Sequence, residues 1–398
     1  MVATTGFYTD SRYRATGDVL DGVVFIRVGD YVGSGALLYD GRALLTAAHL
    51  FNGGGETTVR FDTAAGLQTL AVSKIALHPD FDVDANNDLA VVWLDGSAPI
   101  GADRYELYRD SDEVGQTFTL AGYGAAGTGA VGVDINGPLS STRLKAENRF
   151  DADIGTLKDA LGSGLAWTPV AGTQLVADFD NGAANRDALG QLLGVNDLGL
   201  GLDEGLIAVG DSGGPALIDG RIAGVASYIA SLSAGLSQPD FDAQVNSSFG
   251  EVAAWQRVSA FQPWLDQTLR ANYQDAPQTP EQVETRLVEG DAGTSHAYFL
   301  LQFTGVRVAP EQMLSVDYAT RDGTAVAGAD YIAVNGRLNL YPGEDQAVVP
   351  VEIIGDTLPE LEETFYLDVF NPVGGSFGDG AITLTAMRTI VDDDGFFS

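Results

Sequence analysis

Short apolar runs alternate with clusters of Gly, Asn and Asp along the chain. The runs are rich in Val, Ile, Leu and Tyr, and in the first part of the chain they cover residues 23–28, 36–39, 89–94, 117–122, 215–218 and 222–226. Short runs of this composition between turn residues are typical of antiparallel strands. The pattern therefore predicts an all-β fold for this part of the chain.

One helix is predicted near residue 259, where four apolar residues fall on one helical face: Val258, Phe261, Leu265 and Leu269. Ser259 is placed to cap its first turn. The segment that follows, 271–280, is polar and contains two prolines, as in a semi-rigid linker. We therefore predict a first domain at 1–272, a linker at 273–282 and a second domain at 283–398.

The second domain shows a further series of strand-like runs, separated by turns. They cover residues 297–303, 314–318, 337–341, 347–353, 364–369 and 381–385. This number of short strands in about 100 residues is typical of a β-sandwich. Residues 281–398 also contain 20 acidic and only 5 basic side chains, so the sandwich carries a strong negative charge.

The composition excludes several classes of function. The 398 residues include 55 Asp and Glu against 21 Lys and Arg, a net charge of −34, so we expect no nucleic-acid binding. The 45% hydrophobic content argues against intrinsic disorder. The longest apolar runs are far shorter than the roughly 20 residues of a membrane span, so no transmembrane segment is expected. We also expect no signal peptide in Met1–Gly6, and with no Cys the chain has no disulfide and no thiolate nucleophile.

A serine lies within a glycine-rich turn before an apolar run. The sequence from Gly210 to Pro215 is GDSGGP, and Ala216–Ile218 follows it. Such a turn can present the Ser212 hydroxyl and the N–H groups of Gly210 and Ser212 to one point, where an oxyanion would form. Taken alone, a Gly-Ser-Gly turn is usually only a loop.

A histidine and an aspartate occur in positions that suit this serine. LLTAAH ends an apolar run at His49, and NNDLAVV opens another at Asp88. A serine hydroxyl becomes a good nucleophile only beside a base, and the base needs a carboxylate to orient it. The other histidines suit this role less well, because His78 lies in a turn and His296 in the acidic domain.

Together these segments resemble the chymotrypsin-like, or trypsin-like, serine peptidases. TAAH at 46–49, NDLA at 87–90 and GDSGGP at 210–215 occur in that family's order, and the similarity covers about residues 21–271. The resemblance implies a double six-stranded β-barrel with a C-terminal helix and an active site between the barrels.

The resemblance also implies the catalytic roles. Ser212 would attack the scissile carbonyl, His49 would act as general base and then acid, and Asp88 would orient His49. The amides of Gly210 and Ser212 would form the oxyanion hole. A protein or peptide is the implied substrate.

The same resemblance implies a substrate-binding strand and pocket. Ser227, Tyr228 and Ile229 would pair with the substrate backbone. Leu206 stands where trypsins carry an acid, and Ile229 stands where a glycine is common, so we expect cleavage after small or medium apolar residues. The alternative, that Leu206 and Ile229 are ordinary core residues, is equally open.

The chain departs from the family at three points. It lacks the Ile-Val-Gly-Gly terminus, so Asp211 needs another cationic partner; Arg12 or Arg14 is a candidate, although both can equally be solvated. The segment 124–205 is longer than usual and contains acidic positions at 178–187; we expect a solvated loop there in preference to a calcium site. Without disulfides, packing or bound ions must hold the barrels together.

Carboxylates gather at strand ends of the second domain. Carboxylates brought together at one end of a sandwich repel one another unless a hard cation lies among them, and Ca²⁺ suits such oxygen ligands. The segments 288–293, 317–325, 328–331 and 391–395 resemble Calx-beta domains, over about residues 283–395.

The second resemblance implies an immunoglobulin-like, seven-stranded sandwich with calcium at one end. The implied calcium ligands are Glu289, Asp330, Asp356, Glu360, Asp392, Asp393 and Asp394. Gly355 stands where some members have a further acid. The alternative is a charged, solvated rim without metal.

These observations lead to two functional hypotheses. The first is a secreted bacterial serine endopeptidase with a calcium-binding accessory domain. The second is a non-catalytic or zymogen-locked peptidase fold that mediates binding or adhesion. Covalent labelling by a serine-directed phosphonate discriminates between them.

Overall fold

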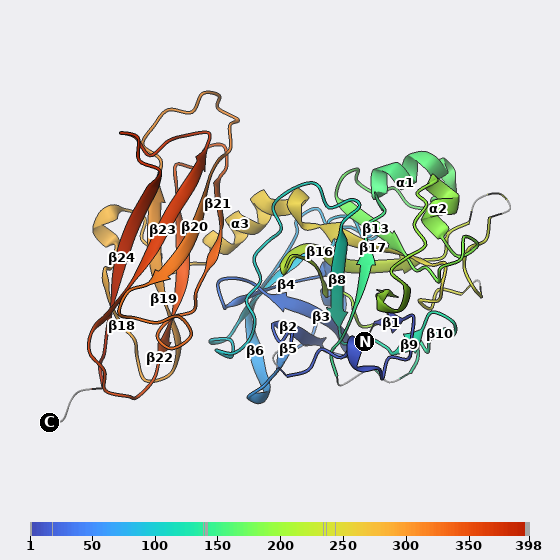
Figure 1. Ribbon diagram of the computed structural model, residues 1–398, viewed down its shortest axis with the longest axis horizontal. Helices are drawn as coiled ribbons and strands as arrows, with labels where there is room; N and C mark the ends of the chain where they lie inside the picture. Colours follow the sequence, from blue (N-terminus) through green and yellow to red (C-terminus); the bar gives the residue numbers. More distant parts are fainter. Residues whose placement is uncertain are drawn as a thin grey trace. The chain divides into compact units, whose positions relative to one another are not determined.

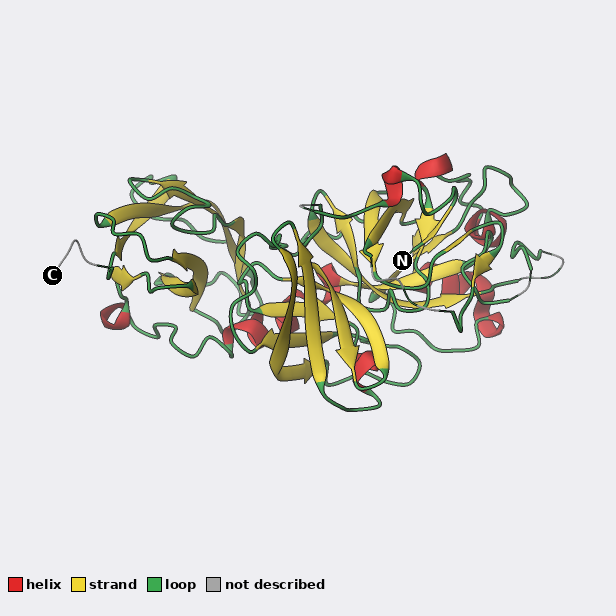
Figure 2. Cartoon of the chain, turned by 90° about the horizontal axis from the view of Figure 1, so that it is seen from below, coloured by secondary structure: helices red, strands yellow, loops and turns green. Residues whose placement is uncertain are grey.

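The computed structural model describes residues 2–17, 19–137, 139, 142–233, 235, 237–242 and 244–394 (Figure 1). It divides into two compact units, the first of residues 1–38 and 42–265 and the second of residues 39–41 and 266–398. Figure 2 shows that strands dominate and that the helices are short. The predicted all-β class is confirmed.

A closed six-stranded barrel forms the first half of the first unit. Its strands, in barrel order, are β2 (Val23–Val28), β3 (Tyr31–Leu37), β4 (Ala43–Thr46), β7 (Ala90–Leu94), β6 (Gly66–Leu77) and β5 (Thr57–Thr63). Alternate side chains of β5 point inward and are buried, including Val59 and Phe61. They pack with Ile26, Leu44 and Val92 in the barrel core.

A seven-stranded sheet forms the second half of this unit. Its order is β11 (Leu144–Arg149), β8 (Thr117–Gly122), β15 (Pro215–Ile218), β16 (Arg221–Ala230), β17 (Val252–Arg257), β13 (Gln174–Asp178) and β12 (Ala152–Asp153). Its core contains an aromatic cluster: the Phe118 and Phe150 rings stack at 4.0 Å, and Trp255 meets Phe118 edge-on at 5.0 Å. A smaller sheet consists of β10 (Gly132–Val133), β9 (Gly127–Thr128), β1 (Ala3–Thr4) and β14 (Gly205–Leu206).

The helices are α1 (Ile154–Leu161), α2 (Ala188–Leu193) and α3 (Gln262–Arg270). Single 3₁₀ turns are η1 (Ser11–Tyr13), η2 (Ala48–Phe51), η3 (Gly162–Gly164), η4 (Gly201–Asp203), η5 (Val258–Phe261) and η6 (Pro280–Gln282). In the part of the chain that is described, no helix is long and apolar enough to span a membrane.

The helix predicted near residue 259 is present, and its four apolar residues are buried. The predicted cap is wrong. The 3₁₀ turn η5 precedes α3, and the Ser259 hydroxyl donates to Glu113 instead.

Buried polar cross-links tie the first unit together. The guanidinium of Arg257 donates from Nε to the fully buried Glu113 carboxylate at 3.0 Å. Fully buried Arg143 donates to the Val23 carbonyl of the first barrel at 3.1 Å and to the Tyr123 hydroxyl after β8 at 2.9 Å. These hydrogen bonds join the two halves in a chain without cysteine.

The second unit is a seven-stranded sandwich. One sheet has the order β18 (Arg286–Val288), β24 (Thr383–Val391), β23 (Glu363–Val373), β20 (Leu314–Asp322) and β21 (Asn335–Leu340); the other pairs β19 (Gly293–Gln302) with β22 (Gln346–Gly355). Val351 and Ile353 from the small sheet pack against Phe365 and Leu367 from the large one. Tyr331 stacks on Phe365 with ring centroids 4.6 Å apart.

Candidate active site

His49 and Asp88 are brought together by neighbouring strands of the first barrel. Thr46 of β4 pairs with Ala90 of β7. His49 follows Thr46 by three residues and Asp88 precedes Ala90 by two, so this pairing brings them together. His49 Nδ1 lies 2.7 Å from Asp88 Oδ2, and the His49 backbone N–H donates to Asp88 Oδ1 at 2.8 Å. Asp88 is fully buried, whereas the His49 side chain is 32% exposed. The imidazole is therefore anchored at one nitrogen and open at its other edge.

Ser227 completes the hydrogen bonding of Asp88. Its hydroxyl donates to Asp88 Oδ2 at 2.5 Å and accepts from Gln256 Nε2 at 3.3 Å. An ionised carboxylate only accepts, so Nδ1 of His49 carries the hydrogen and Nε2 is left as the basic nitrogen. The sequence placed Ser227 on the substrate strand and gave no signal for this second contact.

The turn that carries Ser212 packs against the residues before His49. The Ser34 N–H donates to the Ser212 carbonyl at 2.8 Å, and the Gly213 N–H donates to the Ala226 carbonyl at 2.8 Å. A Cβ on Gly213 would lie 2.0 Å from Thr46 Oγ1, so only glycine allows this close approach. The turn thereby fixes the Ser212 backbone next to the segment that leads into His49.

Two N–H groups of this turn are candidates for an oxyanion hole. Gly210 has φ +92°, and a Cβ there would lie 2.9 Å from Gly124 Cα. Among the described residues, nothing accepts a hydrogen bond from the N–H of Gly210 or of Ser212. Free donors of this kind are what an oxyanion hole requires.

Asp211 stabilises the same turn from inside the protein. Its Oδ1 accepts from the Gly124 N–H at 2.8 Å, and its Oδ2 accepts from the Ala208 N–H at 2.9 Å. Burial raises the pKa of this carboxyl. Arg12 pairs with Asp203 at 3.0 Å and Arg14 is exposed, so the expectation that one of them neutralises Asp211 is wrong.

Two acidic groups form in the second unit: Glu289 with Asp356 and Asp394, and Asp330 with Glu360 and Glu363. In each, one oxygen from every carboxylate lies within 4.8 Å of the others. Glu289 Oε1 and Asp394 Oδ2 are buried without a hydrogen-bond partner in the described residues.

Burial, and then repulsion from the neighbouring carboxylates, Asp356 first, raise the pKa of Glu289 to about 7. A hard cation would relieve both the repulsion and the unpaired oxygens. The residues present therefore fit calcium.

Comparisons with known proteins agree with both halves of this architecture. Residues 14–149 match the family model Trypsin, and residues 300–394 match the family model Calx-beta domain. The chain carries a trypsin-like domain followed by a Calx-beta domain.

The Calx-beta domain is similar to parts of much longer proteins. It is 41% identical over 80 residues to the Drosophila melanogaster sodium/calcium exchanger Calx, covering 20% of this chain and 8% of the exchanger. It is 39% identical over 98 residues to human sodium/calcium exchanger 2, covering 21% of this chain and 11% of that protein. The chain thus spans about a tenth or less of these relatives.

The trypsin-like domain has a solved neighbour in neuropsin, a serine protease expressed in the limbic system of mouse brain. The alignment covers 65% of this chain and 98% of that chain, at 18% identity and a TM-score of 0.47.

In the trypsin-like domain, the residues predicted for substrate binding have different environments. Leu206 is fully buried in the core of the second half and pairs with Ala3 of β1. It presents no surface to a substrate, so its assignment to a pocket is corrected to core packing. Ile229 is partly buried and packs against the same core, and Tyr228 is held by a hydrogen bond to Gln174 Oε1 at 2.7 Å.

The strand β16 offers an edge close to Asp88, which accepts a hydrogen bond from the Ser227 hydroxyl. β15 pairs with it only up to Val225, whereas β17 pairs with it as far as Ala230. The edge of 227–230 that faces away from β17 therefore has no strand partner among the described residues. An extended peptide can add there as a further strand.

In the Calx-beta domain, two predicted ligands lie outside the acidic groups. Asp392 Oδ2 accepts from the Glu360 N–H at 2.9 Å, and Asp393 Oδ1 accepts from the Gly290 N–H at 3.2 Å. These contacts hold the loops that carry the acidic groups in place. A Cβ on Gly355 would lie 2.3 Å from the Gly290 carbonyl, which explains why no acid occupies that position.

Sequence reasoning missed Glu363 and misjudged the acidic segment of the trypsin-like domain. Asp178, Asp180 and Asp187 are each at most 3% exposed, so the expectation of a solvated loop is wrong for these three side chains. Burial, then the carboxylates of Asp178 and Glu204, raise the pKa of Asp180 to about 10, and burial raises that of Glu204 to about 8. Five buried carboxylates, including Asp151, gather here.

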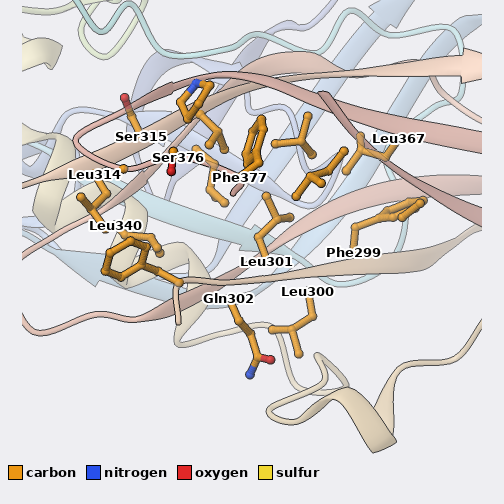
Figure 3. Close-up of a pocket in the computed structure, with 18 of the residues that line it drawn as sticks. Phe299, Leu300, Leu301, Gln302, Leu314, Ser315, Leu340, Leu367, Ser376 and Phe377 are labelled. Atoms are coloured by element: carbon orange, nitrogen blue, oxygen red, sulfur yellow. The ribbon is translucent and has the colours of Figure 1, made fainter. Parts of the chain in front are cut away.

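An apolar cavity of about 280 Å³ lies inside the Calx-beta sandwich. In Figure 3, Leu301 points toward Phe377, whereas its neighbours Leu300 and Gln302 point away. Arg388, also in the lining, donates to the Tyr298 carbonyl at 2.7 Å, and burial lowers its pKa to about 10. The lining holds no nucleophile beside a base, so it is not a candidate for catalysis.

Proposed function

We propose that the chain is a serine endopeptidase that hydrolyses peptide bonds through an acyl-enzyme. The observation that carries this proposal is the His49–Asp88–Ser227 hydrogen-bond network, next to a turn that holds Ser212 and two free N–H groups. The trypsin-like fold supports it.

The arrangement assigns one role to each group. His49 Nε2 takes the Ser212 proton as the hydroxyl oxygen attacks the scissile carbonyl, and later gives it to the leaving amine. Asp88 stabilises the imidazolium that forms between these steps. The N–H groups of Gly210 and Ser212 stabilise the oxyanion, and water then hydrolyses the ester on Ser212 by the same steps in reverse.

The substrate is an extended polypeptide that pairs with the free edge of β16. Ile229 on that edge is apolar and half-buried. We therefore include in the proposal a preference for small or medium apolar residues before the cleaved bond.

A serine-directed phosphonate tests this function directly. We expect one covalent adduct per folded chain, and mass spectrometry of the digested protein should place it on the peptide that contains Ser212. Heat-unfolded protein is the control and should not react, because the activating histidine is then no longer held beside the serine. No adduct on the folded chain would instead favour a binding or adhesion protein.

The proposal includes calcium in the Calx-beta domain, held by Glu289, Asp356 and Asp394 and by Asp330, Glu360 and Glu363. Calcium would neutralise these carboxylates and stabilise the loops that carry them. We also propose that the chain is secreted, and extracellular modules bind calcium with a Kd of about 10⁻⁴–10⁻³ M.

Calcium is expected to stabilise the Calx-beta domain by about 2.7 kcal/mol at a hundredfold excess over Kd. All four tryptophans, Trp93, Trp167, Trp255 and Trp264, precede residue 266. A calorimetric unfolding transition that is not accompanied by a change in tryptophan fluorescence therefore reports on this domain.

Glu289→Gln should remove much of this calcium-dependent stabilisation, and so of the rise in the Tm of the domain, because it deletes one charge and one ligand from the first acidic group. Glu311→Gln, at an exposed acid of the same domain, is the matched control and should keep the full shift. An unchanged shift in Glu289→Gln would contradict the assigned ligands.

A further inference from the structure

The trypsin-like domain contains a buried group of three aspartates at the end of β13. Asp178 is the last residue of β13, Asp180 follows two positions later, and Asp187 is the N-cap of α2. Their exposed fractions are 2%, 3% and 3%. One oxygen from each carboxylate lies within 4.8 Å of the others.

In the described part of the chain, this negative charge is not balanced by any paired basic side chain. Among the described residues, no Lys or Arg forms an ion pair with these aspartates or with the adjacent Asp151 and Glu204. The neighbouring Arg186 donates instead to the Pro239 and Asp240 carbonyls, at 2.7 and 2.8 Å. Arg149 pairs with Asp197 at 2.7 Å.

An unpartnered oxygen is the second observation at this place. Asp180 Oδ1 is buried and has no hydrogen-bond partner in the described part of the chain. An unpaired buried carboxylate oxygen is costly, and native proteins rarely leave one without a partner. Asp178 Oδ2 and Asp187 Oδ1, in contrast, accept from the N–H groups of Leu189 and Gly190, at 2.6 and 2.5 Å.

We infer that Asp178, Asp180 and Asp187 bind a calcium ion inside the trypsin-like domain, separate from the calcium of the Calx-beta domain. Two oxygens bound to one ion at about 2.4 Å lie at most about 4.8 Å apart, and the three aspartates meet that limit. All donors are hard oxygens, which suit Ca²⁺. Mg²⁺ fits less well, because it keeps several of its waters and a buried group has little room for them.

The ion would join elements that are far apart in sequence. The Asp180 N–H donates to Glu204 Oε1 at 2.7 Å, and the Leu200 N–H donates to the other oxygen of Glu204. The site thus connects β13, α2 and the segment before the Ser212 turn. In a chain without disulfides, calcium here would perform the cross-linking that cysteines perform elsewhere.

Tryptophan fluorescence separates this site from the Calx-beta domain, because every tryptophan lies in the first unit. The parent protein for the test is the full chain with Glu289→Gln and Asp330→Asn, which removes one ligand from each acidic group of the Calx-beta domain. In this parent we expect calcium at about a hundred times Kd to raise the Tm seen by tryptophan by about 5 to 10 °C. Magnesium alone should produce a smaller shift.

Asp180→Asn in the same parent should abolish the shift, and equilibrium dialysis with radioactive calcium should show one ion fewer per chain. Asp159→Asn, at an exposed acid of α1, makes the same charge change and should retain both the calcium-dependent Tm shift and the number of bound ions. The inference is overturned if the parent shows no calcium-dependent shift, or if Asp180→Asn keeps it. Should Asp180→Asn fail to fold, the parent's shift decides alone. None of these readouts depends on peptidase activity.

Discussion

Replacing Ser212 with alanine is expected to lower kcat for peptide hydrolysis by about 10⁴- to 10⁶-fold. The substitution removes the attacking oxygen, so no acyl-enzyme forms, and only the oxyanion donors and substrate binding remain. Stability should change by no more than about 0.5 kcal/mol. The reason is that the turn is held by backbone groups, including the bond from the Ser34 N–H to the Ser212 carbonyl.

The measurement is digestion of an unstructured protein by wild type and variant, with mass spectrometry of the fragments. Ser231→Ala, at an exposed serine of the same domain, is the matched control and should cut like wild type. Adding His49→Ala to Ser212→Ala should cost little more, since residues that act as a unit are not additive. Full cleavage by Ser212→Ala would mean that a different group carries the reaction.

The strands with a clear alternation or a fully apolar run could be predicted from the sequence almost to the residue. β2 and β8 begin and end where the runs 23–28 and 117–122 do. The apolar pattern predicts a strand at 381–385, whereas β24 covers Thr383–Val391. The pattern fails here because the first five residues of β24 are exposed and two of its three buried residues, Arg388 and Thr389, are polar. The pattern of apolar and polar residues therefore does not mark this strand, which its pairing with β23 defines.

The candidate functional residues also include some that the sequence predicts and some that it does not. Motif spacing indicates His49, Asp88 and Ser212, because each lies two or three residues from the end of a strand with a clear apolar pattern. Leu206 was misplaced because counting backward from Ser212 says nothing about which side of β14 faces the core. Glu363 was missed because it opens β23 within a run of acids, where no pattern separates a ligand from a solvated side chain.

The buried aspartates near residue 180 show a limit of composition. A polar, acidic segment with Asn and Gly predicts solvent exposure, and residues 181–185 are exposed. Asp178 and Asp187 flank that exposed tip, yet pairing of β13 with β17 and the start of α2 carry them into the interior. Burial of this kind depends on tertiary structure, which one sequence does not reveal.

Asp88→Asn is expected to lower kcat by about 10⁴-fold at neutral pH. Asp88 accepts three hydrogen bonds, two from His49 and one from Ser227. An amide offers only one accepting oxygen, so its NH₂ must face either the His49 backbone N–H or the imidazole. With the NH₂ toward Nδ1, the imidazole carries its hydrogen on Nε2 and no longer accepts the Ser212 proton.

The kinetic pattern separates this orienting role from a structural one. KM should stay near its wild-type value while kcat falls, and phosphonate labelling of Ser212 should slow in parallel, because both reactions need the same basic nitrogen. Ser227→Ala is the matched control: it removes one donor to Asp88 and should cost about tenfold or less. Only the asparagine variant reverses the hydrogen-bond polarity at Nδ1. Equal losses of kcat in the two variants would therefore place the effect in packing around Asp88 and not in the tautomer of His49.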